Sequence, residues 1–387
     1  GSNRDGYAMV GHGTASPLTS GIRKGEMKLA VGGNTVLTDN LSGVRLGHGT
    51  TTAGGITDSG ITLVTGTLDL SNHSRKVGDI ANEMGQDGAV TFAVLNGDLL
   101  VDGSNVSFNH GFDTNFVAAG NVTMAVVVQN SGSGNVGAVS GWDSFAGFDP
   151  ATKQFDGSNG LTLELDFNNC LLMKTLAFDL STVVADSRLW GNNGRKVSIG
   201  DGNQTSGLAF GSAGGSTTVL GHAVELLASN THAHSGSLIG ALPVAGVSPS
   251  GAITVLAREG GVTLAGGTTG AYAQIGHHAY GPIVSALSGD IRVESLGGLA
   301  INGGVGLLSF AQIGHGGNSA TLNTIAGDIA VTAVDDIELT GGSSGGAYAQ
   351  IGHGGVVTKA DIDGDIGVKA GGSVQLEAST SAVAYAK

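Results

Sequence analysis

The sequence predicts an all-β protein, a β-solenoid in which short parallel strands of successive repeats stack along one axis. The first observation is a motif, AYAQIGHGG at residues 347–355, which recurs as AYAQIGHH at 271–278 and SFAQIGHGG at 309–317. The copies lie 38 residues apart, and a fixed period of this size is typical of stacked repeats. The second is composition: 70 of the 387 residues are glycine, and apolar residues fall in short runs between Gly, Asn, Asp and Ser. This pattern indicates many short strands joined by tight turns.

One repeat supplies three strands. Ile329, Val331 and Ala333 alternate with other residues, and Ile337 and Leu339 continue this alternation after a turn. Because a side chain changes face at each residue of a strand, these are two strands with one buried face each. The AYAQIG stretch is the third strand, followed by a Gly-rich turn. The 38 residues then form either one coil of three strands or two smaller coils, and the second arrangement predicts motif ladders at twice the strand spacing.

The repeats divide the chain into three parts. Residues 1–71 hold degenerate solenoid repeats, residues 72–195 form an irregular β-solenoid with insertions, and residues 196–387 are regular, with repeats of 37–38 residues. Because the repeat pattern is already present at residues 7–13, we expect the chain to be a segment of a longer protein.

Composition excludes several classes of function. The formal net charge of −14 opposes binding to phosphate backbones, so we expect no nucleic-acid partner. The single cysteine, Cys170, rules out an internal disulfide framework. No apolar run reaches the roughly 18 residues of a membrane-spanning helix. No GxSxG, HExxH or P-loop motif is present, so we predict that the protein is not an enzyme and uses no cofactor.

A histidine recurs at one repeat position. The ladder consists of His12, His48, His277, His315 and His353. A row of imidazoles is compatible with metal binding or with a pH response. However, no Cys or carboxylate recurs beside it, and one ligand per repeat does not complete a coordination sphere. The pattern therefore favours a structural corner residue that hydrogen-bonds the neighbouring repeat, with no metal.

Aromatic residues form a second predicted ladder, made of Tyr272, Phe310, Tyr348 and Tyr385. Gln274, Gln312 and Gln350 have the same parity, and their polarity predicts that this face points outwards. An exposed aromatic stripe suits docking of another chain or stacking on sugar rings, whereas self-stacking of the rings is the structural alternative. Two irregular loops, 142–157 with Trp142, Phe145 and Phe148, and 229–249 with His232 and His234, are candidate ligand loops.

The AQIGHGG repeats resemble those of bacterial large exoproteins of the filamentous-haemagglutinin type. So do VQNSGSGNVGAVSGWD at 128–143, WGNNGRKVSIGDG at 190–202 and GSAGGSTTVLGHAVELLAS at 211–229. The resemblance implies a right-handed parallel β-helix, export across the outer membrane, and a cell-surface role in adhesion or fibre formation. Such proteins usually carry an N-terminal secretion domain, and no such domain is visible here.

These observations lead to one principal prediction and two alternatives. The chain is expected to be a structural segment of a secreted, cell-surface β-solenoid that forms or projects as an extracellular fibre and mediates adhesion or self-association. The first alternative is a carbohydrate-binding adhesin that recognises a surface glycan or host receptor through loops 142–157 and 229–249. The second is a β-helix enzyme that acts on polysaccharide.

Overall fold

The computed structural model describes residues 8–10, 23–38, 44–46, 56–166, 172–280, 285–318, 320–378 and 385–386. His12 and His48 lie outside these residues, as does the side chain of Tyr385. Strands dominate the described part, with two α-helices, α1 (Val77–Met84) and α2 (Leu180–Ala185), and two 3-10 turns, η1 (Ser187–Leu189) and η2 (Asn192–Gly194). The prediction of an all-β protein with parallel sheets is therefore confirmed.

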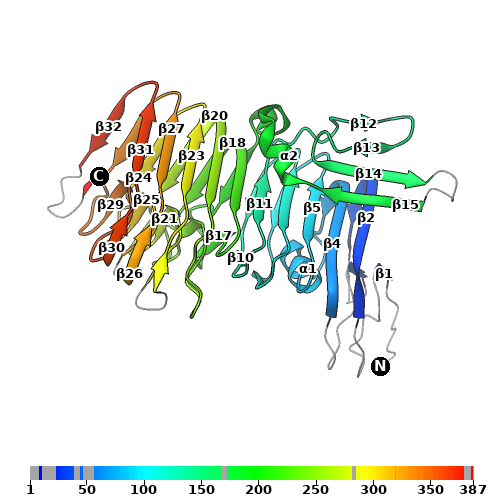
Figure 1. The fold of residues 1–387 in the computed structure, drawn as a ribbon, viewed down its shortest axis with the longest axis horizontal. Coiled ribbons are helices and arrows are strands. Elements are labelled where there is room, and N and C mark those ends of the chain that lie inside the picture. The colour runs from blue at the N-terminus through cyan, green and yellow to red at the C-terminus, as the bar shows by residue number, and fades with distance from the viewer. Residues whose placement is uncertain are drawn as a thin grey trace.

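The largest sheet joins parallel strands from the N-terminal to the C-terminal part of the chain (Figure 1). Its strands are β2 (Arg23–Val36), β4 (Ile56–Asp69), β5 (Val90–Val94), β6 (Leu99–Val101), β8 (Thr114–Ala118), β9 (Val122–Met124), β11 (Val136–Val139), β16 (Lys196–Ile199), β18 (Thr217–Leu227), β20 (Ile253–Ala265), β23 (Ile291–Ser295), β24 (Leu299–Asn302), β27 (Ile329–Ala333), β28 (Ile337–Thr340), β31 (Ile366–Ala370) and β32 (Val374–Glu377). Equivalent residues of successive repeats are direct partners: Ile253 pairs with Ile291, and Ile291 with Ile329.

A second parallel sheet carries the AYAQIG strands. It consists of β7 (Val106–Phe108), β10 (Val128–Asn130), β17 (Leu208–Ser212), β19 (Ser237–Ile239), β21 (Tyr272–Ile275), β25 (Phe310–Ile313), β29 (Tyr348–Ile351) and β33 (Tyr385–Ala386). Because β21 pairs directly with β25, and β25 with β29, each 38-residue repeat advances by one strand spacing. The alternative of two coils per repeat is therefore wrong.

The main core lies between these two sheets. Val255, Val293 and Val331 of the large sheet share one apolar cluster with Ile275 and Ile313 of the second sheet. All five side chains are buried. Neither sheet can bury this face alone, so the repeats depend on stacking for their stability.

Smaller sheets complete the described fold. After each regular motif, the chain forms one strand of a parallel sheet: β22 (Ala286–Leu287), β26 (Thr321–Ala326) and β30 (Lys359–Asp363). Near the N-terminus β1 (Ala8–Val10) pairs with β3 (Val44–Leu46). The third small sheet is antiparallel and contains β12 (Phe148–Asp149), β13 (Gln154–Asp156), β14 (Leu161–Asp166) and β15 (Leu172–Phe178).

The antiparallel sheet and α2 cover the outer face of the large sheet (Figure 1). Val117 and Val139 point outwards from the large sheet and share a second apolar cluster with Leu163 and Val183. The described residues of 142–166 and 172–190 therefore form a second layer over part of the large sheet rather than a loop in solvent.

Candidate functional site

The predicted aromatic ladder is present along the second sheet. Tyr272 pairs with Phe310, and Phe310 with Tyr348. The ring centroids are 5.1 Å and 4.9 Å apart, with interplanar angles of 8° and 3°. The backbone of Tyr385 continues the row by pairing with Tyr348. The described rings thus stack in single file at about one strand spacing.

The prediction that this face is exposed is wrong. Phe310 and Tyr348 are 1% and 0% exposed, and Gln274 and Gln312 are fully buried. The Gly-rich segment after each motif runs back along the ladder: a Cβ added at Gly355 would lie 2.5 Å from the Tyr348 hydroxyl. From Phe310 to Tyr348 the ladder is therefore a covered internal stack, and among its described rings Tyr272 alone is partly exposed.

The buried glutamines join successive repeats. The Nε2 of Gln312 donates to the carbonyls of Gly352 and Gly354, at 2.7 Å and 2.8 Å. Gln274 donates in the same way to Gly314, at 2.8 Å. Each amide therefore satisfies carbonyl groups in the Gly-rich turn of the next repeat, which explains how a polar side chain is accommodated in this interior.

The amide oxygens of the glutamines have a different donor in each repeat. The Tyr348 hydroxyl donates to Oε1 of Gln312, at 3.3 Å. Phe310 has no hydroxyl to donate to Gln274, and there Nδ1 of His278 lies 2.8 Å from Oε1 instead. Later repeats carry Gly316 and Gly354 where the first regular repeat carries His278. The GHH variant of the motif therefore replaces the donor that is missing at Phe310.

Ring stacking and hydrogen bonds to backbone groups hold the histidine ladder together. His277, His315 and His353 stack with centroids 4.9 Å and 5.0 Å apart. The backbone N–H of His277 donates to Nδ1 of His315, and that of His315 to Nδ1 of His353, at 2.9 Å and 3.1 Å. On the other ring edge, Nε2 lies 2.7–2.9 Å from the carbonyls of Gly251, Gly289 and Gly327.

These bonds determine the tautomer of each ring. An amide N–H only donates and a carbonyl only accepts, so Nδ1 carries the lone pair and Nε2 carries the proton. Burial lowers the pKa of His277 to about 4, and burial together with the neighbouring imidazoles holds the pKa of His315 well below its usual value. The rings are neutral at pH 7, and both nitrogens of each are occupied, so this described part of the ladder has no lone pair free for a metal.

A cavity of about 500 Å³ lies where the aromatic ladder begins. Its lining includes Tyr272, His278, Tyr280, Leu308, Phe310 and Asn318. Tyr272 stacks on His278 with centroids 4.2 Å apart, and Tyr280 is 67% exposed at the surface. The Tyr272 ring is partly exposed, although burial raises the pKa of its phenol. Sequence reasoning missed this site; the signal was the departure from GHGG at His278.

The candidate ligand loop at 142–157 is folded differently from the prediction. Trp142 is 2% exposed, and its Nε1 donates to the carbonyl of Asn159 at 2.9 Å. It packs edge-on against Phe178 in the second apolar cluster. Phe148 is partly buried, while Phe145 remains 54% exposed. Burial of Trp142 removes the residue on which a sugar-stacking role for this loop most depended.

The other candidate loop, 229–249, contributes one residue to the cavity. His232 and His234 are both exposed, and His234 lies in the lining beside Gly270. Further along, the loop is anchored by Gln129, whose Nε2 donates to the carbonyl of Leu242 at 3.0 Å.

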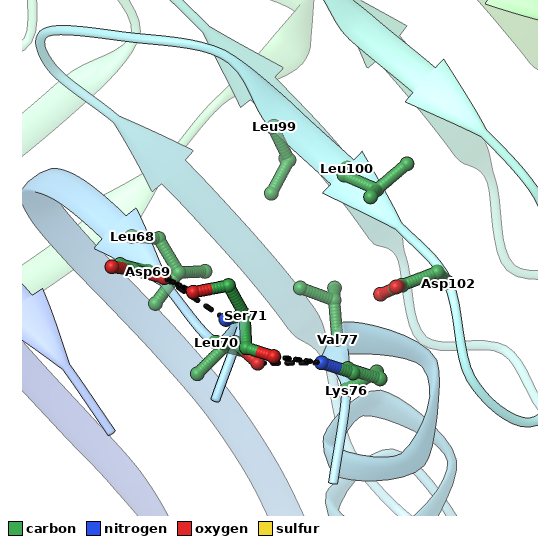
Figure 2. Close-up of a pocket in the computed structure, with 9 residues that line it drawn as sticks. All are labelled: Leu68, Asp69, Leu70, Ser71, Lys76, Val77, Leu99, Leu100 and Asp102. Atoms are coloured by element: carbon green, nitrogen blue, oxygen red, sulfur yellow. Dashed lines mark hydrogen bonds between the residues drawn. The ribbon is translucent and has the colours of Figure 1, made fainter. Parts of the chain in front are cut away.

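A smaller cavity of about 180 Å³ lies between the end of β4, the start of α1 and β6 (Figure 2). Lys76 reaches across it and donates through Nζ to the carbonyls of Leu70 and Ser71, at 2.6 Å and 3.2 Å. Burial raises the pKa of Asp102 on the opposite wall, although Lys76 acts against the rise. The volume is below the range of small-molecule sites, and the lysine is used to hold the chain that leads into the helix.

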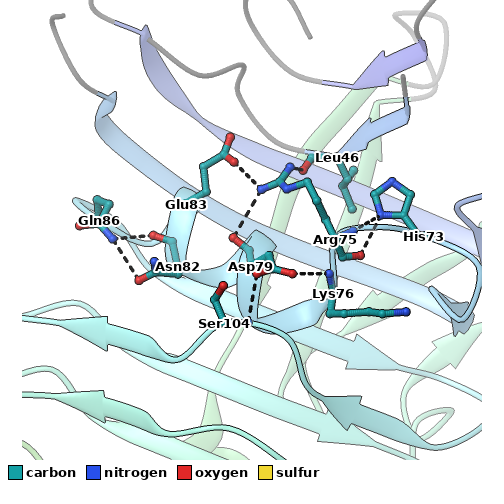
Figure 3. Close-up of polar contacts among 9 residues, drawn as sticks. All are labelled: Leu46, His73, Arg75, Lys76, Asp79, Asn82, Glu83, Gln86 and Ser104. Carbon is teal, nitrogen blue, oxygen red and sulfur yellow. Dashed lines mark hydrogen bonds and ion pairs between the residues drawn. The ribbon is translucent and has the colours of Figure 1, made fainter. Parts of the chain in front are cut away.

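The charged residues around α1 have structural partners as well (Figure 3). Arg75 forms an ion pair with Glu83 and donates to the carbonyl of Leu46, at 3.2 Å. Asp79 accepts from the backbone N–H groups of Lys76 and Ser104, at 2.7 Å and 3.0 Å. The helix also bonds to the edge of the second sheet, where Nε2 of His110 meets the carbonyl of Gly85 at 2.6 Å. This cluster fixes a helix that covers the edge strand β7.

Within the described ranges, no three His, Cys, Asp or Glu side chains are placed to hold a metal ion. No described helix combines the length and apolar character that crossing a bilayer requires. Comparison of the chain with protein-family models, curated proteins and solved structures gave no match. The resemblance to filamentous-haemagglutinin-type exoproteins therefore stays a prediction.

Proposed function

We propose that the chain is a rod-forming segment of a right-handed parallel β-solenoid, displayed at a bacterial cell surface, where it projects as a fibre and mediates adhesion or self-association. The observation that carries the proposal is the register between successive repeats. Equivalent isoleucines, aromatic rings and imidazoles all meet their counterparts one repeat on. Gln274, Gln312 and the stacked histidines form hydrogen bonds to the next repeat, which suits a mechanical role.

Stiffness follows from bonds that run along the stack. Besides the backbone ladder, the backbone N–H of Asp328 donates to Oδ1 of Asp290, and that of Asp365 to Oδ1 of Asp328, at 3.0 Å and 2.8 Å. Together with the glutamine and histidine bonds, these contacts link each regular repeat to the next at several points around its perimeter. Such a stack resists bending because bending must lengthen several bonds at once.

The inner face of the last described repeat is uncovered, and either a continuation of the chain or a second copy of it would cover that face; self-association is the second case. Ile366, Val368, Val374 and Leu376 are between 43% and 55% exposed, whereas their counterparts one repeat earlier are at most 3% exposed. At the opposite end of the same sheet, β2 is an edge strand of 14 residues, close in length to β20, which pairs with both β23 and β24. Pairing of β2 from one copy with β31 and β32 of another would be head-to-tail, and such contacts generate filaments.

Electron microscopy and light scattering test this proposal. The chain is expected to appear as straight rods that lengthen with concentration. Val368→Lys places a charge on the exposed inner face of β31 and is expected to leave single, unextended rods. Lys369→Glu, on the outward face of the same strand, is the matched control and is expected to lengthen like the parent. Rods that stay single at all concentrations contradict self-association, and compact globular particles contradict the rod.

Surface display is tested separately. Antibodies raised against the chain are expected to label intact cells of the source organism and to lose the signal after surface proteolysis. Labelling that appears only after the cells are lysed would contradict this part of the proposal.

A further inference from the structure

We propose that the cavity at the start of the aromatic ladder binds a small, uncharged aromatic molecule that carries a hydroxyl group, of the phenol class. This binding activity goes beyond the rod function and does not depend on it. The cavity has a volume of about 500 Å³, which lies within the usual range for small-molecule sites.

The Tyr272 hydroxyl is without the partner that the equivalent tyrosine has. Tyr348 donates to Gln312, which belongs to the preceding repeat. The residue that corresponds to this glutamine before Tyr272 is Leu238, because Leu238 pairs with Gln274 in the sheet. Leucine has no acceptor, and the Tyr272 hydroxyl has no hydrogen-bond partner within the described ranges. A phenolic O–H that lines the cavity is thus left as a donor for a ligand.

His278 supplies the complementary acceptor. Gln274 directs its Nε2 to the carbonyl of Gly314, so its Oε1 faces His278 and only accepts. Nδ1 of His278 therefore carries the proton, and Nε2 carries a lone pair. Burial lowers the pKa of this imidazole to about 4, so the lone pair is retained at neutral pH. One donor and one acceptor match a ligand hydroxyl, which both accepts and donates a hydrogen bond.

The rest of the lining selects an apolar ring without charge. Tyr280 and Leu308 contribute apolar surface, and Asn318 is held by a bond from its Nδ2 to the carbonyl of Leu308, at 2.6 Å. No Asp, Glu, Lys or Arg is among the described lining residues, and the remaining polar ring, His234, is exposed to solvent. A charged ligand would therefore lose hydration without gaining a carboxylate, ammonium or guanidinium partner. Aromatic side chains pack well against another aromatic ring. A sugar has more hydroxyl groups than these few polar atoms can satisfy, which disfavours it.

Binding of p-cresol to the intact chain tests the proposal, measured by calorimetry and by saturation-transfer NMR. The dissociation constant is expected to be on the order of 1 mM or tighter for a ligand of this size. Toluene, which lacks the hydroxyl, and glucose, a neutral sugar, are the comparison probes, and both are expected to bind more weakly. Absence of p-cresol binding, or tighter binding of glucose at the same site, would overturn the proposal.

Two conservative variants locate the site. Tyr272→Phe removes only the hydroxyl. Because the ladder already contains a phenylalanine at the equivalent position, Phe310, the ring stack is expected to persist. It should weaken p-cresol binding about fivefold to tenfold, the usual effect of one neutral hydrogen bond. Tyr348→Phe removes a hydroxyl that is bonded to Gln312 and does not line the cavity, so binding should be unchanged. Equal affinities of the parent and Tyr272→Phe would refute the assignment, as would equal losses in the two variants.

Discussion

Acidification is expected to loosen the regular repeats through their buried histidines. Burial holds the pKa of both His277 and His278 at about 4, compared with 6.5 for an exposed imidazole. The folded state therefore takes up protons less readily than the unfolded state. The stability that depends on neutral histidines is fully present above the pKa of the unfolded state, and it is lost as the pH falls from about 6.5 towards 4. His315 and His353 contribute in the same direction, because burial lowers their pKa values as well.

The size of the effect follows from the two pKa values. At pH 5 an unfolded histidine is almost fully protonated and His277 in the fold is mostly neutral, so this residue alone costs about 2 kcal/mol relative to pH 7.5. His278 adds about the same amount, which gives roughly 4 kcal/mol for the pair. Protonation of Nδ1 would also break the bond that His315 accepts from the backbone of His277.

Hydrogen exchange measured by mass spectrometry reports this loss locally. Peptides covering residues 271–280 and 309–318 are expected to lose protection between pH 7.5 and pH 5, after correction for the intrinsic pH dependence of exchange. The variant His278→Gly, which carries the residue found at 316 and 354, removes one of the titrating groups. Its pH-dependent loss should be smaller by about 2 kcal/mol, or roughly 30-fold in protection factor. Protection that is independent of pH would refute the claim that the buried imidazoles are neutral in the folded state. So would a pH-dependent loss of protection that is the same in the parent and in His278→Gly.

Two further predictions concern packing. Gly314 has φ +151°, and a Cβ there would lie 2.0 Å from the carbonyl oxygen of Gly352, so Gly314→Ala should destabilise the stack by more than about 1 kcal/mol in urea unfolding. At Gly367 an added Cβ would meet nothing nearer than 4.0 Å, so Gly367→Ala should change the free energy of unfolding by no more than about 0.5 kcal/mol. Similar losses of stability at both positions would contradict the close approach of the turns. Trp142→Ala should lower the free energy of unfolding by about 3–5 kcal/mol in thermal unfolding, because it leaves a cavity at a buried site. Phe145→Ala should lower it far less. A Trp142→Ala variant as stable as the parent would contradict the burial of the indole.

The period of the sequence was sufficient to predict which residues meet between repeats. Tyr272, Phe310 and Tyr348 are partners in the sheet because the 38-residue spacing keeps equivalent positions in register. Alternation also identified the inward residues of the large sheet correctly, since Val293 and Val331 are buried. Both predictions rest on strand geometry alone, which a repeated sequence constrains strongly.

The burial of the ladder face was not predicted, because the polarity of glutamine was taken as a sign of exposure. Gln312 is buried because its amide satisfies carbonyls in the next turn, and these partners are known only once the repeats are stacked. One signal was available: Leu322 and Ile325 follow the motif and are buried in a further strand layer. Similarly, Val117 and Val139 are apolar on the outward parity, which indicates a covering layer such as the one that contains Trp142.

The distance between equivalent residues of successive repeats tests the central claim most directly. Arg292 and Ala330 are exposed partners in neighbouring strands, and Gly367 is the partner of Ala330 one repeat further on. In a Cys170→Ser background, spin labels on cysteines at 292 and 330 should interact strongly, at about 5 Å between backbones, and labels at 292 and 367 should be about 10 Å apart. Separations beyond reach of strong dipolar coupling for both pairs would contradict a register of one strand spacing per repeat.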